Sequence, residues 1–202
     1  MSLRPAATLV CVALLLALLP AFGLSAMAQT FRDYQCGTTM YMSTRRTIPF
    51  MKDVVARADL IVRAGIGRGT SHLSDDARKI FTTYELVAPR VLFTSRSVPP
   101  RFGLDSAGSL VMAQLGGTIF RDGRTDCPVS MSVSESPTLT PGMDVVLLLL
   151  MWDGQFYGFD GVFEVRDSAI VLTNAGPSDG EQFKRMPVDR FIARVLTIKN
   201  AR

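Results

Sequence analysis

The sequence contains a single histidine, His72, and only three cysteines among its 202 residues. A metal site built from several histidines of one chain is therefore excluded. The sequence also lacks the Gly-x-Ser-x-Gly and Ser-x-x-Lys motifs that carry a nucleophilic serine, so serine hydrolysis has no support. Because no strong catalytic or metal-binding pattern is left, the sequence predicts no catalytic residue, no cofactor and no metal ligand.

An excess of charge of one sign is missing as well. The chain has 22 Lys and Arg residues against 18 Asp and Glu residues, which gives a formal net charge of +4. The basic residues are scattered along the chain and alternate with acidic ones. A nucleic-acid-binding surface needs basic residues gathered on one face, interleaved with exposed aromatic rings. We therefore expect no nucleic-acid partner.

Charge is almost absent from residues 1–28, where Arg4 is the only charged residue. An apolar run follows at residues 6–19, and Ala26 and Ala28 provide the small-x-small pattern that signal peptidase cleaves. These features predict a signal peptide that is removed after Ala28. The mature protein is then expected to be secreted or periplasmic.

An uncleaved membrane anchor is the alternative for this segment, because residues 5–31 carry no charge and are long enough to cross a bilayer. Pro20 and Gly23 interrupt the segment and argue against a stable spanning helix. After cleavage, no stable membrane span is expected. Removal of 28 of the 202 residues leaves 174, which fits one domain better than two.

Two cysteines remain after cleavage, Cys36 near the new N-terminus and Cys127 beyond the middle of the chain. In an oxidising compartment, such an even pair predicts a disulfide. The bridge would close a loop of roughly 90 residues and, by chain-entropy estimates, stabilise the fold by about 4 to 5 kcal/mol. It would attach residues 29–48, a polar segment without clear periodicity that we interpret as an irregular N-terminal arm.

Alternating and apolar runs predict five or six short strands in the rest of the chain. The most apolar run, residues 143–152, is hydrophobic on both faces and predicts the central strand of the core. Gly65, Gly67 and Gly69 predict a bend or bulge, and Pro89 predicts a bend within a long strand. The other expected strands are residues 59–65, 80–93, 109–115, 162–165 and 170–172, with loops at 70–79 and 121–141.

Two helices are predicted at the ends of the domain. A short one begins at Pro49 and ends near Ala58, and an amphipathic one begins at Pro187. The apolar stripe of the second helix is expected to pack over one end of a barrel; an exposed stripe would instead indicate a lipid-surface protein. Since no helices separate the strands, a parallel α/β fold is excluded. We predict a mainly β fold for residues 49–202: a small antiparallel barrel of five to six strands.

One stretch of the chain resembles the opening of netrin-module domains, a group that includes the tissue inhibitors of metalloproteinases. The matching residues are an Ala-Asp strand at 56–66 and a second strand at 84–92. A similar order recurs in small secreted bacterial proteins of largely unassigned function, with Gly116-Gly117, Pro141-Gly142 and the strand at 161–163 as further matches here. The resemblance implies a barrel of the oligonucleotide/oligosaccharide-binding (OB) type.

The inhibitor activity of that family does not follow from the resemblance. In those inhibitors the mature chain begins at a cysteine whose amino group and carbonyl chelate the zinc of the target. Here seven residues, 29–35, precede Cys36 in the predicted mature chain. Inhibition would therefore require further processing at Cys36.

A loop with three polar candidates follows the first predicted strand. His72, Asp75 and Asp76 lie close enough in sequence for one loop to wrap a cation. The same residue types are also typical of an ordinary solvated loop. The neighbouring glycines, Gly65 to Gly69, lack the Lys-Ser/Thr pair and the following helix of a phosphate-binding loop.

Asp153-Gly154, a dipeptide typical of tight hairpins, follows the central strand. Four aromatic residues crowd this hairpin: Trp152, Phe156, Tyr157 and Phe159. As a binding surface, these rings could stack on a sugar or a peptide. As structure, they would fill the mouth of the barrel. Both interpretations are open at this point.

These observations together favour a function outside the cytoplasm and without catalysis. We expect an exported binding or regulatory module, inhibitor-like only after processing at Cys36, that acts on an extracytoplasmic protein or glycan. The alternative is an extracytoplasmic hydrolase or metal-dependent enzyme of unrecognised type. A pocket where His72, Asp75 or Asp76 meets a second polar group would favour the enzyme, and an open surface without such convergence would favour the binding module.

Overall fold

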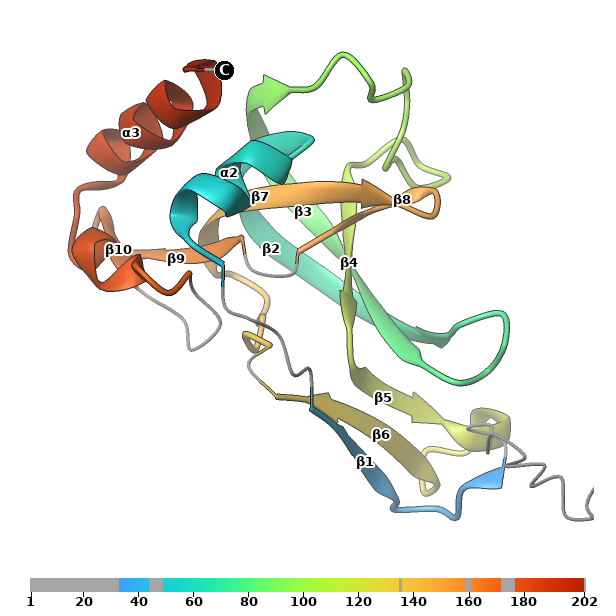
Figure 1. The fold of residues 1–202 in the computed structure, drawn as a ribbon. Helices are drawn as coiled ribbons and strands as arrows, with labels where there is room; N and C mark the ends of the chain where they lie inside the picture. The colour runs from blue at the N-terminus through green and yellow to red at the C-terminus, as the bar shows by residue number, and fades with distance from the viewer. Residues whose placement is uncertain (1–32, 44–48, 135, 159–160, 172–176, 202) are drawn as a thin grey trace, which may run out of the picture.

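The computed structural model describes residues 33–43, 49–134, 136–158, 161–171 and 177–201. The predicted signal peptide lies outside these ranges. The described residues form two sheets and two α-helices (Figure 1). The strands are β1 (Thr39–Met42), β2 (Leu60–Leu73), β3 (Ile80–Thr94), β4 (Val111–Leu115), β5 (Gly117–Phe120), β6 (Pro128–Val133), β7 (Asp144–Trp152), β8 (Gln155–Tyr157), β9 (Val162–Arg166) and β10 (Ala169–Val171). The helices are α2 (Met51–Arg57) and α3 (Val188–Asn200), with 3₁₀ turns η3 (Arg121–Gly123) and η4 (Gly180–Phe183).

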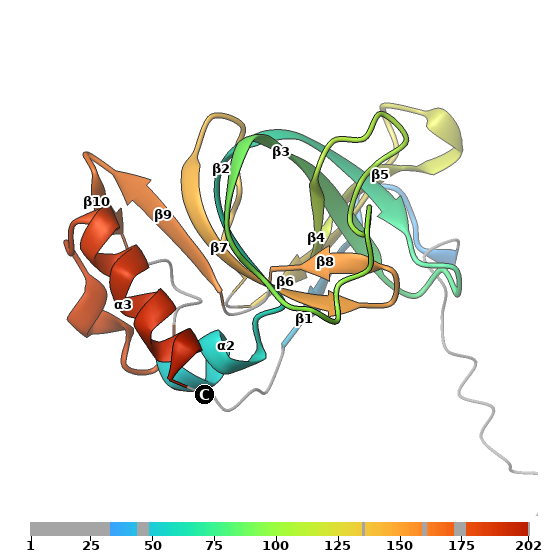
Figure 2. The ribbon, with the colours of Figure 1, turned by 90° about the horizontal axis from the view of Figure 1, so that it is seen from above.

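The larger sheet closes on itself. Its strand order is β10-β9-β7-β2-β3-β4-β8, and β8 pairs with β7 as well as with β4. Strands β7, β2, β3, β4 and β8 therefore form a ring, which Figure 2 shows end-on. Every pairing in the ring is antiparallel except β4 with β8. The predicted mainly β fold with a small barrel is confirmed.

Strand β7 is buried on both sides, as its composition predicts. Leu147 and Leu149 point into the barrel, where they join residues of β2 and β4 in one apolar cluster. Val146 and Leu148 point outward and join the cluster beneath the two helices. Because side chains alternate along a strand, only an apolar run can fill both environments.

The two helices pack beside the barrel and not over its opening (Figure 2). Val188, Phe191 and Val195 of α3 are buried against the outer face of β7 and β9, so the expectation of a lid over one end is wrong. Their burial also removes the apolar stripe that a lipid-surface role requires. Lys199 joins the two helices, because its Nζ donates to the carbonyl oxygens of Ala56 and Ala58 at 3.0 and 2.7 Å.

Strand β2 is longer than predicted and continues through the glycine series to Leu73. The β2–β3 register shifts next to Gly65 and Gly69, which confirms a bulged strand but not a strand end at Gly65. A Cβ at Gly69 would lie 2.7 Å from Cε1 of Tyr84, so the missing side chain lets the partner strand approach. The predicted loop at 70–79 shrinks to the turn around residues 74–79.

A second, three-stranded sheet with order β1-β6-β5 lies below the barrel in Figure 1. Its inner face packs on the end of the β2–β3 hairpin, with Met131 and Ile80 at the centre of the cluster. The predicted irregular arm thus contains strand β1, and the predicted loop at 121–141 contains β6. The disulfide between Cys36 and Cys127 is confirmed and joins the start of this arm to the start of β6.

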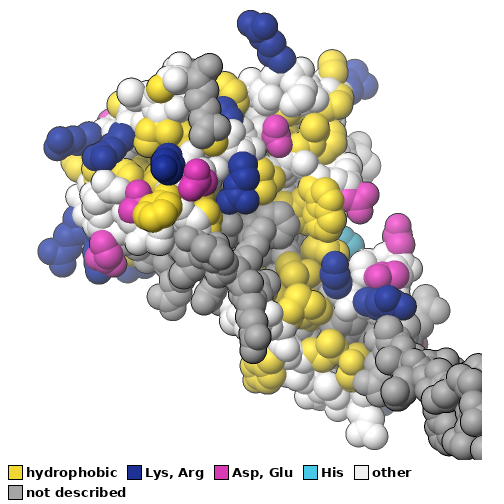
Figure 3. All heavy atoms as spheres, viewed as in Figure 1, with side chains coloured by type: hydrophobic (Ala, Val, Ile, Leu, Met, Phe, Trp, Pro, Cys, Tyr) yellow, Lys and Arg dark blue, Asp and Glu magenta, His cyan; other side chains and the backbone are white. Residues whose placement is uncertain are grey.

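No helix in the described ranges is long and apolar enough to cross a membrane. Over the face seen in Figure 3, basic and acidic side chains are interspersed, as the sequence predicts.

Candidate functional site

The aromatic hairpin does not form one exposed surface. Trp152 is 52% exposed, but Phe156 and Tyr157 are only 1% and 5% exposed. The Phe156 ring packs against Phe102 at 5.0 Å between centroids, inside the barrel cluster. Phe159 lies outside the described residues. Phe156 therefore fills the barrel, whereas Tyr157 packs on the other side of the strand with Phe81 and Ala113.

His72 and the two aspartates are not brought together into a cation site. His72 lies on β2 opposite Phe81, with ring centroids 6.3 Å apart. Oδ1 of Asp76 accepts hydrogen bonds from the Ser74 hydroxyl at 2.6 Å and the Arg78 N–H at 3.1 Å, which hold the pKa of Asp76 below its usual value. In the part of the chain that the structure describes, no three His, Cys, Asp or Glu side chains gather as metal ligands.

A polar pocket of about 200 Å³ lies where the barrel meets the three-stranded sheet. It is bordered by β3, β4, β6, the Gly116-Gly117 link and residues 136–139. None of the described side chains that line it is charged. The polar groups belong to Thr82, Tyr84, Gln114, Ser132, Ser136 and Thr138, and the rest of the wall is apolar or glycine.

Gln114 is the most unusual side chain of this pocket, because it is polar and only 6% exposed. Its Nε2 donates to Oγ of Ser136 at 2.6 Å and to the carbonyl oxygen of Pro137 at 2.8 Å. Since a backbone carbonyl can only accept, the amide nitrogen must lie on that side. Within the described residues, Oε1 of Gln114 accepts no hydrogen bond. Every fully buried side-chain oxygen or nitrogen among these residues has a hydrogen-bond partner, so Oε1 is not fully buried. This oxygen is therefore reachable from the pocket.

Among the described residues, Thr82 is the other buried polar side chain, at 8% exposure. Its Oγ1 donates to the carbonyl oxygen of Gly116 at 2.8 Å and lies 2.9 Å from Oγ of Ser71. Gly117, with a φ of +137°, passes so close that a Cβ would overlap with both hydroxyl oxygens. Because Gly116 and Gly117 carry no side chain, the chain can pass from β4 of the barrel to β5 of the smaller sheet while staying in close contact with Thr82 and Ser71. The pocket wall therefore stays closed at this link.

Tyr84 adds an aromatic wall to the pocket. Its ring is half-buried and lies against the bare backbone of Gly69. Burial raises the pKa of the Tyr84 hydroxyl, and a hydrogen bond with Thr82 opposes the shift only in part. The hydroxyl therefore stays protonated near neutral pH and can donate a hydrogen bond.

The face of the three-stranded sheet that points away from the apolar cluster begins beside the polar pocket. Register pairs Thr39 with Ser130, and Thr118 with Ser130, on the side opposite the apolar cluster. The hydroxyls of Thr118 and Ser130 lie 2.8 Å apart. Ser132 belongs both to this face and to the lining of the pocket. A row of hydroxyls thus leads away from the pocket, with Tyr41 exposed beside it.

Sequence reasoning did not find this pocket. Of its lining residues, only Tyr84, Gly116 and Gly117 were singled out, as part of the netrin-module pattern. The available signal was Gln114, an isolated amide within the apolar strand at 109–115. A polar residue at a position that strand alternation buries calls for a partner, and here the partners come from residues 136 and 137.

Comparison with known proteins gives no relative: no family model matches the chain, and no curated protein matches it significantly. The resemblance to netrin modules stays a prediction.

Proposed function

We propose that the protein is an exported, non-enzymatic binding module whose ligand is a neutral glycan outside the cytoplasm. The observation that carries the proposal is Gln114, a buried amide whose carbonyl oxygen is left available in a pocket whose described lining is uncharged and rich in hydroxyls. Export is part of the proposal and rests on the predicted signal peptide. The disulfide fits an oxidising compartment.

The donors and acceptors of the pocket match the chemistry of a sugar. Sugar hydroxyls both donate and accept, so one of them can donate to Oε1 of Gln114 while another pairs with the hydroxyl of Ser132 or Thr138. The ring of Tyr84 offers an apolar surface for the C–H face of a pyranose. A phosphate or carboxylate would instead need a cation, and the described residues of the lining include none.

The hydroxyl row on the three-stranded sheet supports a ligand longer than one sugar. Ser132 belongs to the pocket, and Ser130 and Thr118 follow on the same face. A chain that starts in the pocket can continue from Ser132 along Ser130 and Thr118, and the exposed ring of Tyr41 lies beside Ser132 on β1. We therefore expect oligosaccharides to bind more tightly than monosaccharides.

The test is a screen of the mature protein against neutral and acidic oligosaccharides, followed by calorimetric titration of the best ligand. We expect Gln114→Leu to weaken binding by about tenfold, because a buried ligand hydroxyl loses its acceptor. Gln155→Leu, the same change on the β7–β8 hairpin, serves as the matched control and should leave binding unchanged. Ser132→Ala, which leaves no buried group unpaired, should weaken binding without affecting folding.

Each other outcome points elsewhere. Binding only to acidic glycans, or binding unaffected by both Gln114→Leu and Ser132→Ala, would rule out this ligand and this site. Recovery of shortened oligosaccharides after incubation would favour the enzymatic alternative. A mature N-terminus at Cys36 together with capture of a metalloprotease would favour an inhibitor.

A further inference from the structure

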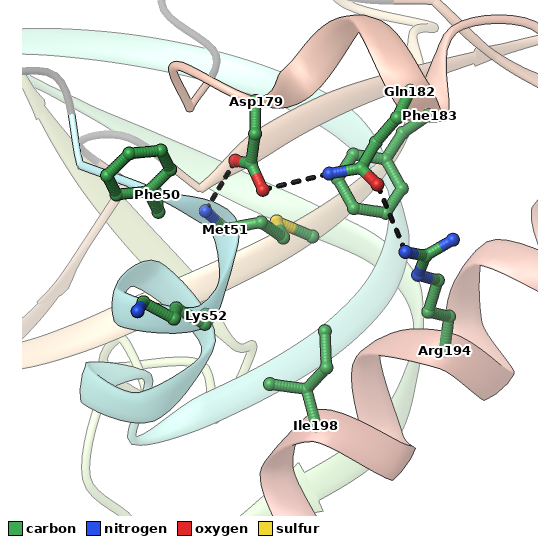
Figure 4. A pocket seen from close by; sticks show the side chains of 8 residues that line it. All are labelled: Phe50, Met51, Lys52, Asp179, Gln182, Phe183, Arg194 and Ile198. Atoms are coloured by element: carbon green, nitrogen blue, oxygen red, sulfur yellow. Dashed lines mark hydrogen bonds between the residues drawn. The ribbon is translucent and has the colours of Figure 1, made fainter.

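A second pocket, of about 240 Å³, lies between the start of α2, the turn η4 and the outer side of α3 (Figure 4). It shares no lining residue with the polar pocket. Its apolar lining comes from Met51 and Phe183, each 1% exposed, and from the partly buried Ile198. Phe50 stands at its edge with 55% of its surface exposed.

A chain of three hydrogen bonds forms one wall of this pocket. Asp179 accepts from the Met51 N–H at 2.7 Å and from Nε2 of Gln182 at 2.8 Å, one bond to each carboxylate oxygen. A guanidinium nitrogen of Arg194 donates to Oε1 of Gln182 at 3.0 Å. The negative charge of Asp179 is therefore already engaged with donors of the protein.

The positive charge of the pocket is less fully engaged. The Arg194 guanidinium lies over the Phe183 ring at 5.2 Å and makes a single hydrogen bond within the described residues, although a guanidinium has five N–H donors. Lys52 lies on the other side of the pocket and contacts only the face of Phe50, at 5.8 Å, among these residues (Figure 4). Arg194 is thus the cation with open donors beside one satisfied carboxylate, whereas the Lys52 ammonium points away from Arg194 (Figure 4).

We propose that this pocket binds a small amphiphilic carboxylate, namely a medium-chain fatty acid anion. The carboxylate pairs with the open donors of Arg194, and the alkyl chain lies on Met51 and Ile198 toward the exposed ring of Phe50. Guanidinium groups favour carboxylates because both can form two parallel hydrogen bonds. Pockets for drug-sized ligands measure about 300 Å³ or more, so this one suits a smaller molecule.

The experiment titrates the mature protein with sodium octanoate, below its micellar concentration, by calorimetry. Three probes separate the contributions of charge and chain: acetate, octyltrimethylammonium and octyl glucoside. We expect octanoate to bind at least tenfold more tightly than each of them. Arg194→Gln should weaken octanoate binding about tenfold, whereas Arg190→Gln, an exposed arginine of the same helix, should leave it unchanged.

Arg194→Gln also removes a hydrogen bond from the wall of the pocket, so a second variant is needed that leaves this wall intact. Phe50→Ala lies outside the hydrogen-bond chain and should weaken octanoate several-fold while leaving butyrate, whose chain does not reach the ring, unaffected. The proposal is overturned by a lack of octanoate binding at millimolar concentration. It is also overturned by equal binding of the cationic probe, or by unchanged octanoate affinity in both variants.

Discussion

The glycine link between the barrel and the three-stranded sheet allows a sharp test of how the polar pocket is held. We consider Gly117→Ala. Gly117 has a φ of +137°, and an added Cβ would overlap with Oγ1 of Thr82 and Oγ of Ser71. A conformation that L side chains rarely adopt costs about 1 to 3 kcal/mol. Displacing the Ser71–Thr82 hydrogen bond, which spans 2.9 Å, adds about 0.5 to 1.5 kcal/mol.

The expected loss in the free energy of unfolding is therefore about 1.5 to 4.5 kcal/mol. Gly123→Ala is the matched control, because Gly123 also has a positive φ, +72°, but no atom lies within 4 Å of its would-be Cβ. This variant should lose only the backbone contribution, about 1 kcal/mol. Urea unfolding followed by circular dichroism gives both values.

A double-mutant cycle then separates overlap from backbone strain. Thr82→Ala removes one of the two oxygens that the new methyl group would strike, so Gly117→Ala should cost less in that background, by about 1 kcal/mol. If Gly117→Ala and Gly123→Ala are equally destabilising, or if the cycle is additive within about 0.3 kcal/mol, the close approach at the link is not what holds the pocket.

Other predictions concern the disulfide, the core and the β2–β3 turn. Replacing both Cys36 and Cys127 by serine should lower the free energy of unfolding by about 4 to 5 kcal/mol, because the bridged residues are 91 positions apart; an unchanged urea midpoint would contradict this. Leu147→Ala should cost about 2 to 5 kcal/mol since Leu147 is fully buried, against less than about 1 kcal/mol for Leu104→Ala at a 39% exposed position, and similar losses would refute the core assignment. The folded-state pKa of Asp76 is lowered by the hydrogen bonds it accepts, so its stabilisation is present above the unfolded value of about 3.9 and is lost as pH falls through the folded pKa. Asp76→Asn should flatten that part of an acid titration of stability, and superimposable titrations would argue against the turn contacts.

The features that the sequence predicted correctly are those that local pattern and burial determine together. The run at 143–152 must be buried on both faces, and β7 is, with the barrel on one side and the helices on the other. Asp153-Gly154 predicts a tight hairpin, and both residues adopt positive φ between β7 and β8. The α3 stripe identified a helix, but its packing partner depends on where the chain places β9.

The features that were missed depend on contacts between distant residues. Gly65, Gly67 and Gly69 resemble a strand end, yet β2 continues through them because β3 brings side chains into the space that they leave. Strand β1 has no alternating apolar pattern long enough to recognise. It exists because β6 pairs with it in parallel, 91 residues further along the chain at Thr39 and Ser130. The polar pocket lies between the two features that were missed, the long β2–β3 pair and the sheet that contains β1 and β6.

The position of the polar pocket between the barrel and the smaller sheet links the disulfide to the proposed glycan site. The barrel side of the pocket, with Thr82 and Gln114, rests on β3 and β4 and does not depend on the N-terminal arm. The opposite wall, with Met131 and Ser132, belongs to β6, whose outer neighbour β1 is fixed by the bridge at Cys36. Opening the bridge frees one wall and leaves the other in place. Glycan binding must then restore the order of β6, which costs free energy. Octanoate is proposed to bind in the other pocket, at the helices. Reduction of the disulfide should therefore weaken glycan binding more than octanoate binding.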